Sequence, residues 1–310
     1  MKIVFAGSSE YAIPALKALL SAPEHNVLLV LSQSPSPQGR RQKLEATPLA
    51  KYAQDNGLSV FCPEDVNSQE SVDYILGHKA DILITASYGA YLKRRLRQGF
   101  ALGAINLHPS LLPQYRGASP IRTALINGDK QSGNTIFRIV AKMDAGPILS
   151  QKDLKIYDGE NYSSLHDRLA LQAAELLILL LPALPDIQAQ EQDHSAATFS
   201  NKIDKNDLIL DFDRDSVSLE NQIRAYSLVP GAFASFRDTK LKILRVESTR
   251  SLPDLPPGHI IEIVKNIGFS ISTKDGKLLV LQVQAAGKKI MDAYSYHLGA
   301  RLSVGERIGI

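Results

Sequence analysis

The sequence lacks several features that would mark a specialised class of protein. It has 310 residues and a single cysteine, Cys62. One cysteine excludes an internal disulfide and a zinc site built from several thiolates, and it favours a reducing, cytoplasmic setting. The most apolar stretch, ELLILLLPALP at 175–185, is too short to span a bilayer and contains two prolines. The sequence therefore predicts no membrane-spanning segment and no membrane partner.

A strong excess of one charge sign is also missing. The net charge is +3, with 44% hydrophobic and 22% charged residues, which is typical of a soluble globular protein. This excess is too small to indicate a nucleic-acid partner by itself. Two basic clusters, GRRQK at 39–43 and KRRLR at 93–97, are denser and could contact phosphates. Solvated surface cations are an equally good interpretation of each cluster alone.

Several cofactor and catalytic motifs are absent from the sequence. There is no Walker loop, no Gly-x-Ser-x-Gly elbow and no His-Glu-x-x-His pair. The seven histidines are scattered, with none at the helical spacing of a metal pair, so we expect no metal site. A dinucleotide-binding turn requires three glycines and an acidic residue at the end of the second strand. The first turn here has only Gly7, and the second strand ends in Ser32 and Gln33. An NAD-linked oxidoreductase is therefore disfavoured.

Apolar strand-like runs alternate with helical segments through the first half of the chain. This pattern predicts an α/β fold with a doubly wound, Rossmann-like parallel sheet. The expected strands are 2–7, 26–32, 59–63, 81–87 and 103–108, and the helices between them are near 11–21, 47–56, 68–77 and 91–97. An antiparallel hairpin over 133–140 and 146–156 should follow, then a helix over 163–181.

The second half of the chain has a different sequence pattern. A polar stretch at 188–202 indicates a linker, and short strands with Gly, Pro and Asp-Gly turns follow it. These strands predict a small β-barrel or sandwich, and the pattern alone does not separate the two. A barrel of the OB-like type would suit an oligonucleotide partner, and it is the fold that we expect. We therefore expect a catalytic domain at 1–189, a linker at 190–207 and a C-terminal β-barrel domain at 208–310.

Two polar side chains, Asn106 and His108, interrupt the apolar run INLHPSLLP at 105–113. Side chains two positions apart in a strand lie on the same face, so the amide and the imidazole should emerge together. The carboxyl ends of strands in an open α/β sheet border the ligand crevice. With a carboxylate nearby, the pair would suit acyl transfer through oxyanion stabilisation and proton transfer. A capped strand end with a buried, satisfied histidine is the structural alternative.

The segment INLHPSLLPQYRGASPI at 105–121 resembles the Asn-x-His and Ser-Leu-Leu-Pro signature of the 10-formyltetrahydrofolate-dependent formyltransferase family. A second segment, MDAGPIL at 143–149, resembles the loop that carries the aspartate of this family. The resemblance extends almost end to end to the methionyl-tRNA formyltransferases within that family. It includes the basic insertion at 38–53 and two C-terminal segments at 223–233 and 281–308.

The resemblance implies a function and a set of site residues. The implied reaction moves the formyl group of 10-formyltetrahydrofolate to the α-amine of methionyl initiator tRNA, by direct attack of the amine. Asn106, His108 and Asp144 would be catalytic: Asn106 and His108 would stabilise the oxyanion, and Asp144 would orient His108 and assist proton transfer. The residues expected to border the folate are Ser110, Leu111, Leu112, Pro113, Tyr88 and Gly89.

The insertion is expected to contact the tRNA. It contains Arg40, Arg41 and Lys43, of which Arg40 matches the family's arginine best. The chain is expected to be a monomer. Two other hypotheses remain: a formyltransferase or hydrolase acting on a sugar nucleotide or water, and an RNA-binding module without turnover. The basic insertion and the β-rich C-terminal half favour tRNA as the acceptor, and the complete catalytic trio favours an enzyme.

Overall fold

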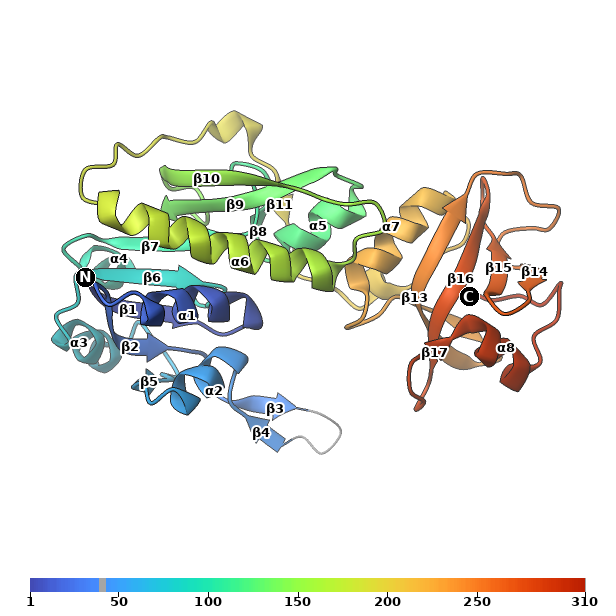
Figure 1. Cartoon of the computed structure of the whole chain (residues 1–310), viewed down its shortest axis with the longest axis horizontal. Helices are drawn as coiled ribbons and strands as arrows, with labels where there is room; N and C mark the ends of the chain where they lie inside the picture. The colour runs from blue at the N-terminus through green and yellow to red at the C-terminus, as the bar shows by residue number, and fades with distance from the viewer. Residues whose placement is uncertain (39–42, 310) are drawn as a thin grey trace. The chain divides into compact units, whose positions relative to one another are not determined.

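A computed structural model describes residues 1–38 and 43–309 of the chain (Figure 1). The chain divides into two compact units, which we consider separately. The first unit comprises residues 1–120, 131–155 and 166–200, and the second comprises residues 121–130, 156–165 and 201–310. Each unit therefore combines segments that are distant in sequence.

A seven-stranded sheet is the centre of the first unit, with the strand order β10-β9-β7-β6-β1-β2-β5 among the described residues. Neighbouring strands from β5 to β7 are parallel, and β9 and β10 are antiparallel to their neighbours. This arrangement confirms the predicted doubly wound sheet with a hairpin at its edge. The strands are β1 (Lys2–Gly7), β2 (Asn26–Leu31), β5 (Val60–Phe61), β6 (Ile82–Ala86), β7 (Ala104–His108), β9 (Gln131–Arg138) and β10 (Ile148–Lys155).

Helices cover both faces of this sheet because its strands are apolar on both sides. Val4 and Leu31 pack in one buried cluster with Val72 and Leu96 of the helices α3 and α4. Figure 1 shows α1 and α6 crossing the other face. Within the described ranges, no helix is long and apolar enough to cross a membrane. The helices of the first half are α1 (Ile13–Ser21), α2 (Pro48–Asp55), α3 (Gln69–Gly77), α4 (Arg94–Gln98), α5 (Pro120–Ile126) and α6 (Tyr162–Leu180).

Two small two-stranded pairings were not predicted from the sequence. Strand β3 (Ser36–Gln38) pairs antiparallel with β4 (Lys43–Glu45) within the basic insertion. Strand β8 (Arg116–Gly117) pairs parallel with β11 (Phe199–Ser200). The second pairing joins the segment after β7 to residues inside the expected linker. Part of the expected linker is thus fixed beside the C-terminal end of β7.

The second unit contains an antiparallel sheet with the order β12-β13-β16-β15-β14, and β17 pairs with β16. The predicted β-rich C-terminal half is confirmed. The order has β12 and β14 at its two ends, and the pairings described do not join them into a closed barrel. Two helices, α7 (Ser216–Tyr226) and α8 (Ala293–Ala300), pack on the sheet. The strands are β12 (Phe233–Phe236), β13 (Thr239–Thr249), β14 (Ile260–Val264), β15 (Gly268–Ser272), β16 (Lys277–Ala285) and β17 (Met291–Asp292).

Candidate active site

The amide of Asn106 lies near the carboxyl end of β7 and is fixed by the neighbouring strand. Thr85 of β6 is its register partner, and the Thr85 hydroxyl donates a hydrogen bond of 2.6 Å to Asn106 Oδ1. Because this bond uses the amide oxygen, it directs the –NH2 group away from Thr85. Within the described part of the chain, that –NH2 group has no hydrogen-bond acceptor. Asn106 therefore presents an oriented, unused donor.

The imidazole of His108 is buried, with 4% of the residue exposed, and one of its ring nitrogens is already used. Its Nε2 atom is 2.9 Å from the carbonyl oxygen of Tyr115. A carbonyl oxygen only accepts hydrogen bonds, so Nε2 carries the hydrogen. The other nitrogen, Nδ1, is left to exchange a proton. His108 Nε2 thus donates the hydrogen bond that orients the ring to the Tyr115 carbonyl oxygen, whereas the family resemblance implied that Asp144 orients it.

Asp144 reaches the imidazole from the segment between β9 and β10. Its Oδ2 atom is 3.9 Å from His108 Nδ1. That distance is too long for a hydrogen bond, but it allows an ion pair when the imidazole is protonated. The same oxygen accepts a hydrogen bond of 2.8 Å from the backbone N–H of Gly117. The structure therefore brings the carboxylate predicted from the sequence to the free side of the imidazole.

The backbone around the carboxylate has an uncommon conformation. Asp144 has φ = 50° and Tyr115 has φ = 58°, both in the left-handed region. Gly117 has φ = 116°, and a Cβ atom at this position would overlap the Ser200 carbonyl oxygen. Only glycine permits this close approach of β8 and β11. The hydrogen bond from Gly117 to Asp144 depends on it.

Thr135 of β9 fixes the Ser-Leu-Leu-Pro segment that follows β7. The fully buried hydroxyl of Thr135 donates to the Ser110 carbonyl at 2.6 Å and accepts from the Leu112 N–H at 3.1 Å. It also accepts from the Gln151 side chain at 2.8 Å, and the same amide donates to the Leu112 carbonyl at 2.9 Å. Sequence reasoning missed Thr85, Thr135 and Gln151, because their roles depend on strand register, which the sequence pattern does not give.

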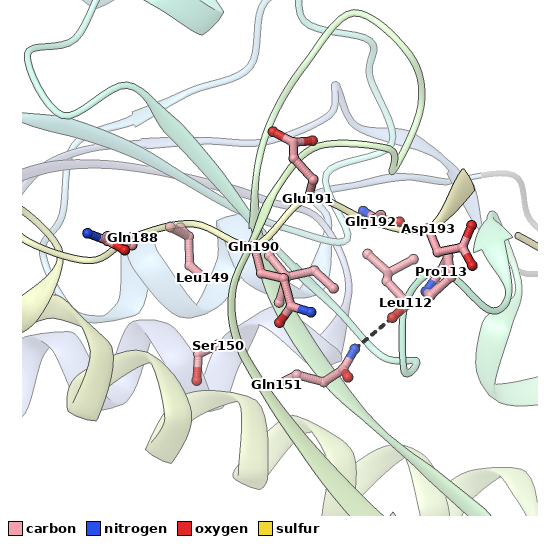
Figure 2. A pocket seen from close by; sticks show the side chains of 11 residues that line it. Leu112, Pro113, Leu149, Ser150, Gln151, Gln188, Gln190, Glu191, Gln192 and Asp193 are labelled. Atoms are coloured by element: carbon pink, nitrogen blue, oxygen red, sulfur yellow. Dashed lines mark hydrogen bonds between the residues drawn. The ribbon is translucent and has the colours of Figure 1, made fainter. Parts of the chain in front are cut away.

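A cavity of about 450 Å³ lies beside this segment (Figure 2). Of the residues predicted to border folate, it includes Leu112 and Pro113. The Ser110 side chain is buried and donates to the Gln114 carbonyl at 2.6 Å, and Tyr88 is buried in the apolar core. Ser110, Leu111, Tyr88 and Gly89 do not line this cavity. Its other lining residues are Ile148, Leu149, Ser150, Gln151, Gln188, Gln190, Glu191, Gln192 and Asp193.

The residues predicted to contact tRNA belong to the insertion. Lys43 is exposed at the start of β4, next to Leu44, of which 65% is exposed. Arg40 and Arg41 lie outside the described residues. Their predicted role stays a prediction.

The assembled groups offer one type of chemistry. A free amide donor, an imidazole nitrogen and a carboxylate lie at the end of the sheet where α/β proteins bind ligands. Such a set can stabilise an oxyanion and move a proton. In residues 1–38 and 43–309, no group of three His, Cys, Asp or Glu side chains is placed to hold a metal ion.

Two family models match the chain and together cover most of it. The model described as formyl transferase matches residues 1–181, and the model described as the formyl transferase C-terminal domain matches residues 202–301. The boundaries of these matches fall close to the polar segment expected as a linker.

Curated relatives match along their full length. The chain is 37% identical to the methionyl-tRNA formyltransferase of Methylococcus capsulatus, with 100% of both chains covered. It is 38% identical to the enzyme of that name from Thermotoga maritima, with 99% of this chain and 98% of the relative covered. The corresponding Coxiella burnetii protein is 33% identical, with 94% and 93% covered.

Solved structures show the same fold at lower identity. An N-formyltransferase from Helicobacter canadensis, solved with folinic acid and dTDP-3-aminofucose, has a TM-score of 0.65 at 20% identity and covers 92% of this chain and 99% of its own. HypX from Aquifex aeolicus has a TM-score of 0.67 at 15% identity, and the chain spans 48% of its length. The models and the full-length relatives agree, and the chain therefore belongs to the formyl transferase family, among the methionyl-tRNA formyltransferases.

Proposed function

We propose that the chain transfers the formyl group of 10-formyltetrahydrofolate to the α-amine of methionine esterified to initiator tRNA. One observation supports this most directly. An unused amide donor on Asn106 and a free imidazole nitrogen on His108 share the end of β7, with a carboxylate oxygen 3.9 Å from that nitrogen. Family membership supplies the reaction class, and this group of side chains supplies the chemistry that the reaction requires.

The residues present fit a folate donor. The unused –NH2 group of Asn106 suits a carbonyl oxygen, and the cavity beside Leu112 and Pro113 offers space next to the fixed loop. We propose that Ser110, Leu111, Leu112 and Pro113 border the donor on one side, with Tyr88 and Gly89 on another. When bound, the folate supplies the formyl group.

The chain's own residues would act in sequence. Asn106 donates to the oxygen on which negative charge develops, and protonated His108 contributes a second donor through Nδ1. Asp144 stabilises the positive charge of the imidazolium and assists the removal of the amine proton. As the bond between the formyl carbon and folate N10 breaks, a proton passes to N10, so that tetrahydrofolate can leave. One oxyanion donor is typically worth about 10²–10³ in rate, and a positioned proton-transfer group about 10²–10⁴.

The tRNA would be bound mainly through its phosphates. We propose that Arg40, Arg41 and Lys43 contact the acceptor arm, and that the C-terminal part contributes further binding surface. The division into a catalytic domain at 1–189, a linker at 190–207 and a tRNA-binding domain at 208–310 belongs to the same proposal. The proposed setting is the cytoplasm, and the proposed state is a monomer.

An acceptor assay tests this function. The purified chain is given 10-formyltetrahydrofolate together with methionyl-tRNA, an amino-sugar nucleotide or water alone, and the products are detected by mass. We expect N-formylmethionyl-tRNA to form only when the folate donor is present. Preferential formylation of the sugar nucleotide, or release of formate at the same rate without an acceptor, would overturn the proposal. Tight tRNA binding with no turnover would favour the RNA-binding alternative.

A further inference from the structure

A buried glutamine holds the backbone on both sides of the Ala145 position, directly after the candidate catalytic carboxylate. Gln192, of which 6% is exposed, donates from Nε2 to the carbonyl oxygens of Asp144 at 3.0 Å and Gly146 at 2.6 Å. These two bonds use both hydrogens of the amide. They fix the peptide group that follows Asp144 and the one that follows Gly146.

The orientation of the Gln192 amide is itself fixed by a buried cation. Arg116 donates to Gln192 Oε1 from Nη2 at 2.6 Å and from Nε at 3.2 Å. If the amide were turned over, its –NH2 group would face the guanidinium and its oxygen would face two carbonyl oxygens. Both contacts would be repulsive, so Arg116 determines that Gln192 can only donate to the Asp144 segment.

Arg116 is an unusual residue to find in this position, because 1% of it is exposed. Burial of a guanidinium is costly unless its donors are used. Its Nη2 also contacts His194 Nδ1 at 2.9 Å, while Nη1 has no hydrogen-bond partner among the described residues. Removal from water lowers the pKa of Arg116, and the negative charge of Asp144 opposes that shift. The Arg116 guanidinium therefore interacts with Asp144 in two ways, directly through electrostatic attraction to the carboxylate and indirectly through the Gln192 hydrogen bonds.

The chain segment that carries Gln192 is attached on both sides. Gln190 forms a backbone bridge with Ile148 of β10, with hydrogen bonds of 2.7 and 2.8 Å. On the other side, the Asp193 side chain accepts from the Ser195 N–H at 2.9 Å and begins a short helical turn. Gln192 is thus held in place next to the Asp144 segment.

We propose that Gln192 is a positioning residue for formyl transfer: oriented by Arg116, it sets where the Asp144 carboxylate stands relative to His108. This inference rests on the proposed function. Asp144 is held twice, through its carboxylate by the Gly117 N–H and through its carbonyl by Gln192. Loss of the second hold leaves the left-handed backbone of Asp144 free to move, and the 3.9 Å separation from His108 changes with it.

The test uses Gln192→Glu, which keeps the size of the side chain and its contact with Arg116 but loses the donors to the two carbonyls. We expect kcat to fall by about 10- to 100-fold, since a misplacement of about 1 Å can cost about 100-fold. KM for methionyl-tRNA should change by less than about threefold. Gln192→Ala should lower kcat by a similar factor. Because alanine is uncharged, this result would exclude the carboxylate charge of the Gln192→Glu variant as the cause. Gln54→Glu, at an exposed glutamine of α2, is the matched control and should match the unmodified chain.

A double-variant measurement separates positioning from a general structural role. In an Asp144→Asn background, Gln192→Ala should reduce single-turnover formyl transfer by less than about twofold, because Gln192 acts through Asp144. An equal loss in both backgrounds would overturn the proposal.

Hydrogen exchange keeps the test independent of the proposed reaction. The amides of 142–146 should exchange faster in Gln192→Ala than in the unmodified chain, whichever acceptor is used. Unchanged exchange would overturn the role of Gln192 even if formylation is observed. If the exchange changes as expected but methionyl-tRNA is not formylated, the proposed function fails, whereas the role of Gln192 in holding the Asp144 segment stands.

Discussion

At the scale of single residues, the orientation of the Asn106 side-chain amide depends on its hydrogen bond with Thr85. That hydroxyl holds the amide oxygen at 2.6 Å and leaves the –NH2 group as the donor on the ligand side. An unsatisfied donor in a partly buried strand end is unfavourable in the free protein, and it is satisfied when an oxyanion arrives. Under the proposed function, the strand end would bind a negative charge that exists only during the reaction.

Replacement of Asn106 by aspartate tests this directly. The introduced carboxylate would still accept from Thr85 but could no longer donate, so we expect kcat to fall by about 10²–10³. Thr85→Val keeps the Asn106 donor but removes the hydroxyl that orients it. We therefore expect a smaller decrease in kcat, about tenfold. Steady-state formylation assays measure both. A Thr85→Val variant more impaired than the Asn106 variant would contradict the assigned roles.

The residue types and their spacing predicted part of this site. Strand alternation placed Asn106 and His108 on one face without any structure, because that period is fixed by the backbone. Asp144 is distant from both in sequence, and it was predicted from the family resemblance and not from spacing. Thr85 and Gln192 were not found, since a threonine in an apolar strand and a glutamine in a polar run carry no distinguishing pattern.

At the scale of elements, the close packing at the edge of β9 and β10 depends on Gly146, two residues after Asp144. A Cβ atom built on Gly146 would overlap the carbonyl oxygen of Arg138. Nearby, the Arg138 N–H donates to the Pro147 carbonyl at 2.9 Å and closes the hairpin. The backbone segments on either side of Asp144 therefore touch without room for a side chain.

Gly146→Ala should disturb this hairpin. We expect a loss of roughly 3 kcal/mol in the free energy of unfolding, with reduced activity, because backbone atoms must shift to accept the methyl group. Gly77→Ala is the control: it ends α3, has open space around it and should be neutral or slightly stabilising. Urea unfolding measures both variants. Equal free energies of unfolding for the two variants would contradict this prediction, because they would show that the backbone around Gly146 accepts a methyl group without losing stability.

A second element-level prediction concerns the end of α8. Arg237 donates to Glu306 Oε1 at 2.6 Å and to the Ala300 carbonyl at 2.8 Å. The hydrogen bond from Arg237, followed by that from the Ser303 N–H, lowers the pKa of Glu306. A lowered pKa in the folded state means that Glu306 stabilises the fold at neutral pH. That contribution is lost as the pH falls through its pKa.

Glu306→Gln should therefore lower stability at about pH 7 and have a smaller effect at about pH 3. Urea unfolding at the two pH values measures the effect. Glu262→Gln, which removes an exposed pair with Lys277, should have a small effect at both values. The interpretation fails if Glu306→Gln is equally destabilising at the neutral and the acidic pH.

Element prediction from the sequence succeeded where hydrophobic period and length agreed. The strands of the first half match closely because parallel strands buried on both faces are continuous apolar runs. The helices α7 and α8 were missed, since Asp215 and Asp292 cap short segments within a strand-rich region. The β3–β4 hairpin was not predicted, because its polar, proline-containing segments have no apolar alternation.

At the scale of the whole molecule, the compact units are assembled from separated parts of the sequence. In the second unit, Arg224 of α7 donates to the carbonyl oxygens of Glu160 and Leu125 at 3.2 and 3.3 Å. These contacts join residues that are distant in sequence, 64 and 99 positions apart. Local periodicity cannot show such pairings, so boundaries drawn along the sequence describe composition better than they describe contacts. The division at 189 and 208 stays a prediction.

The proposed mechanism requires that Asn106, His108 and Asp144 act together in one reaction. Single-turnover formyl transfer to methionyl-tRNA tests this requirement most directly. The rate is compared among the unmodified chain, His108→Ala, Asp144→Asn and the variant with both changes. Each single change should reduce the rate by roughly 10²–10⁴. The double variant should be no slower than the worse single one, since the two groups serve one proton transfer. A His108→Ala rate near that of the unmodified chain, or losses that multiply, would contradict the account.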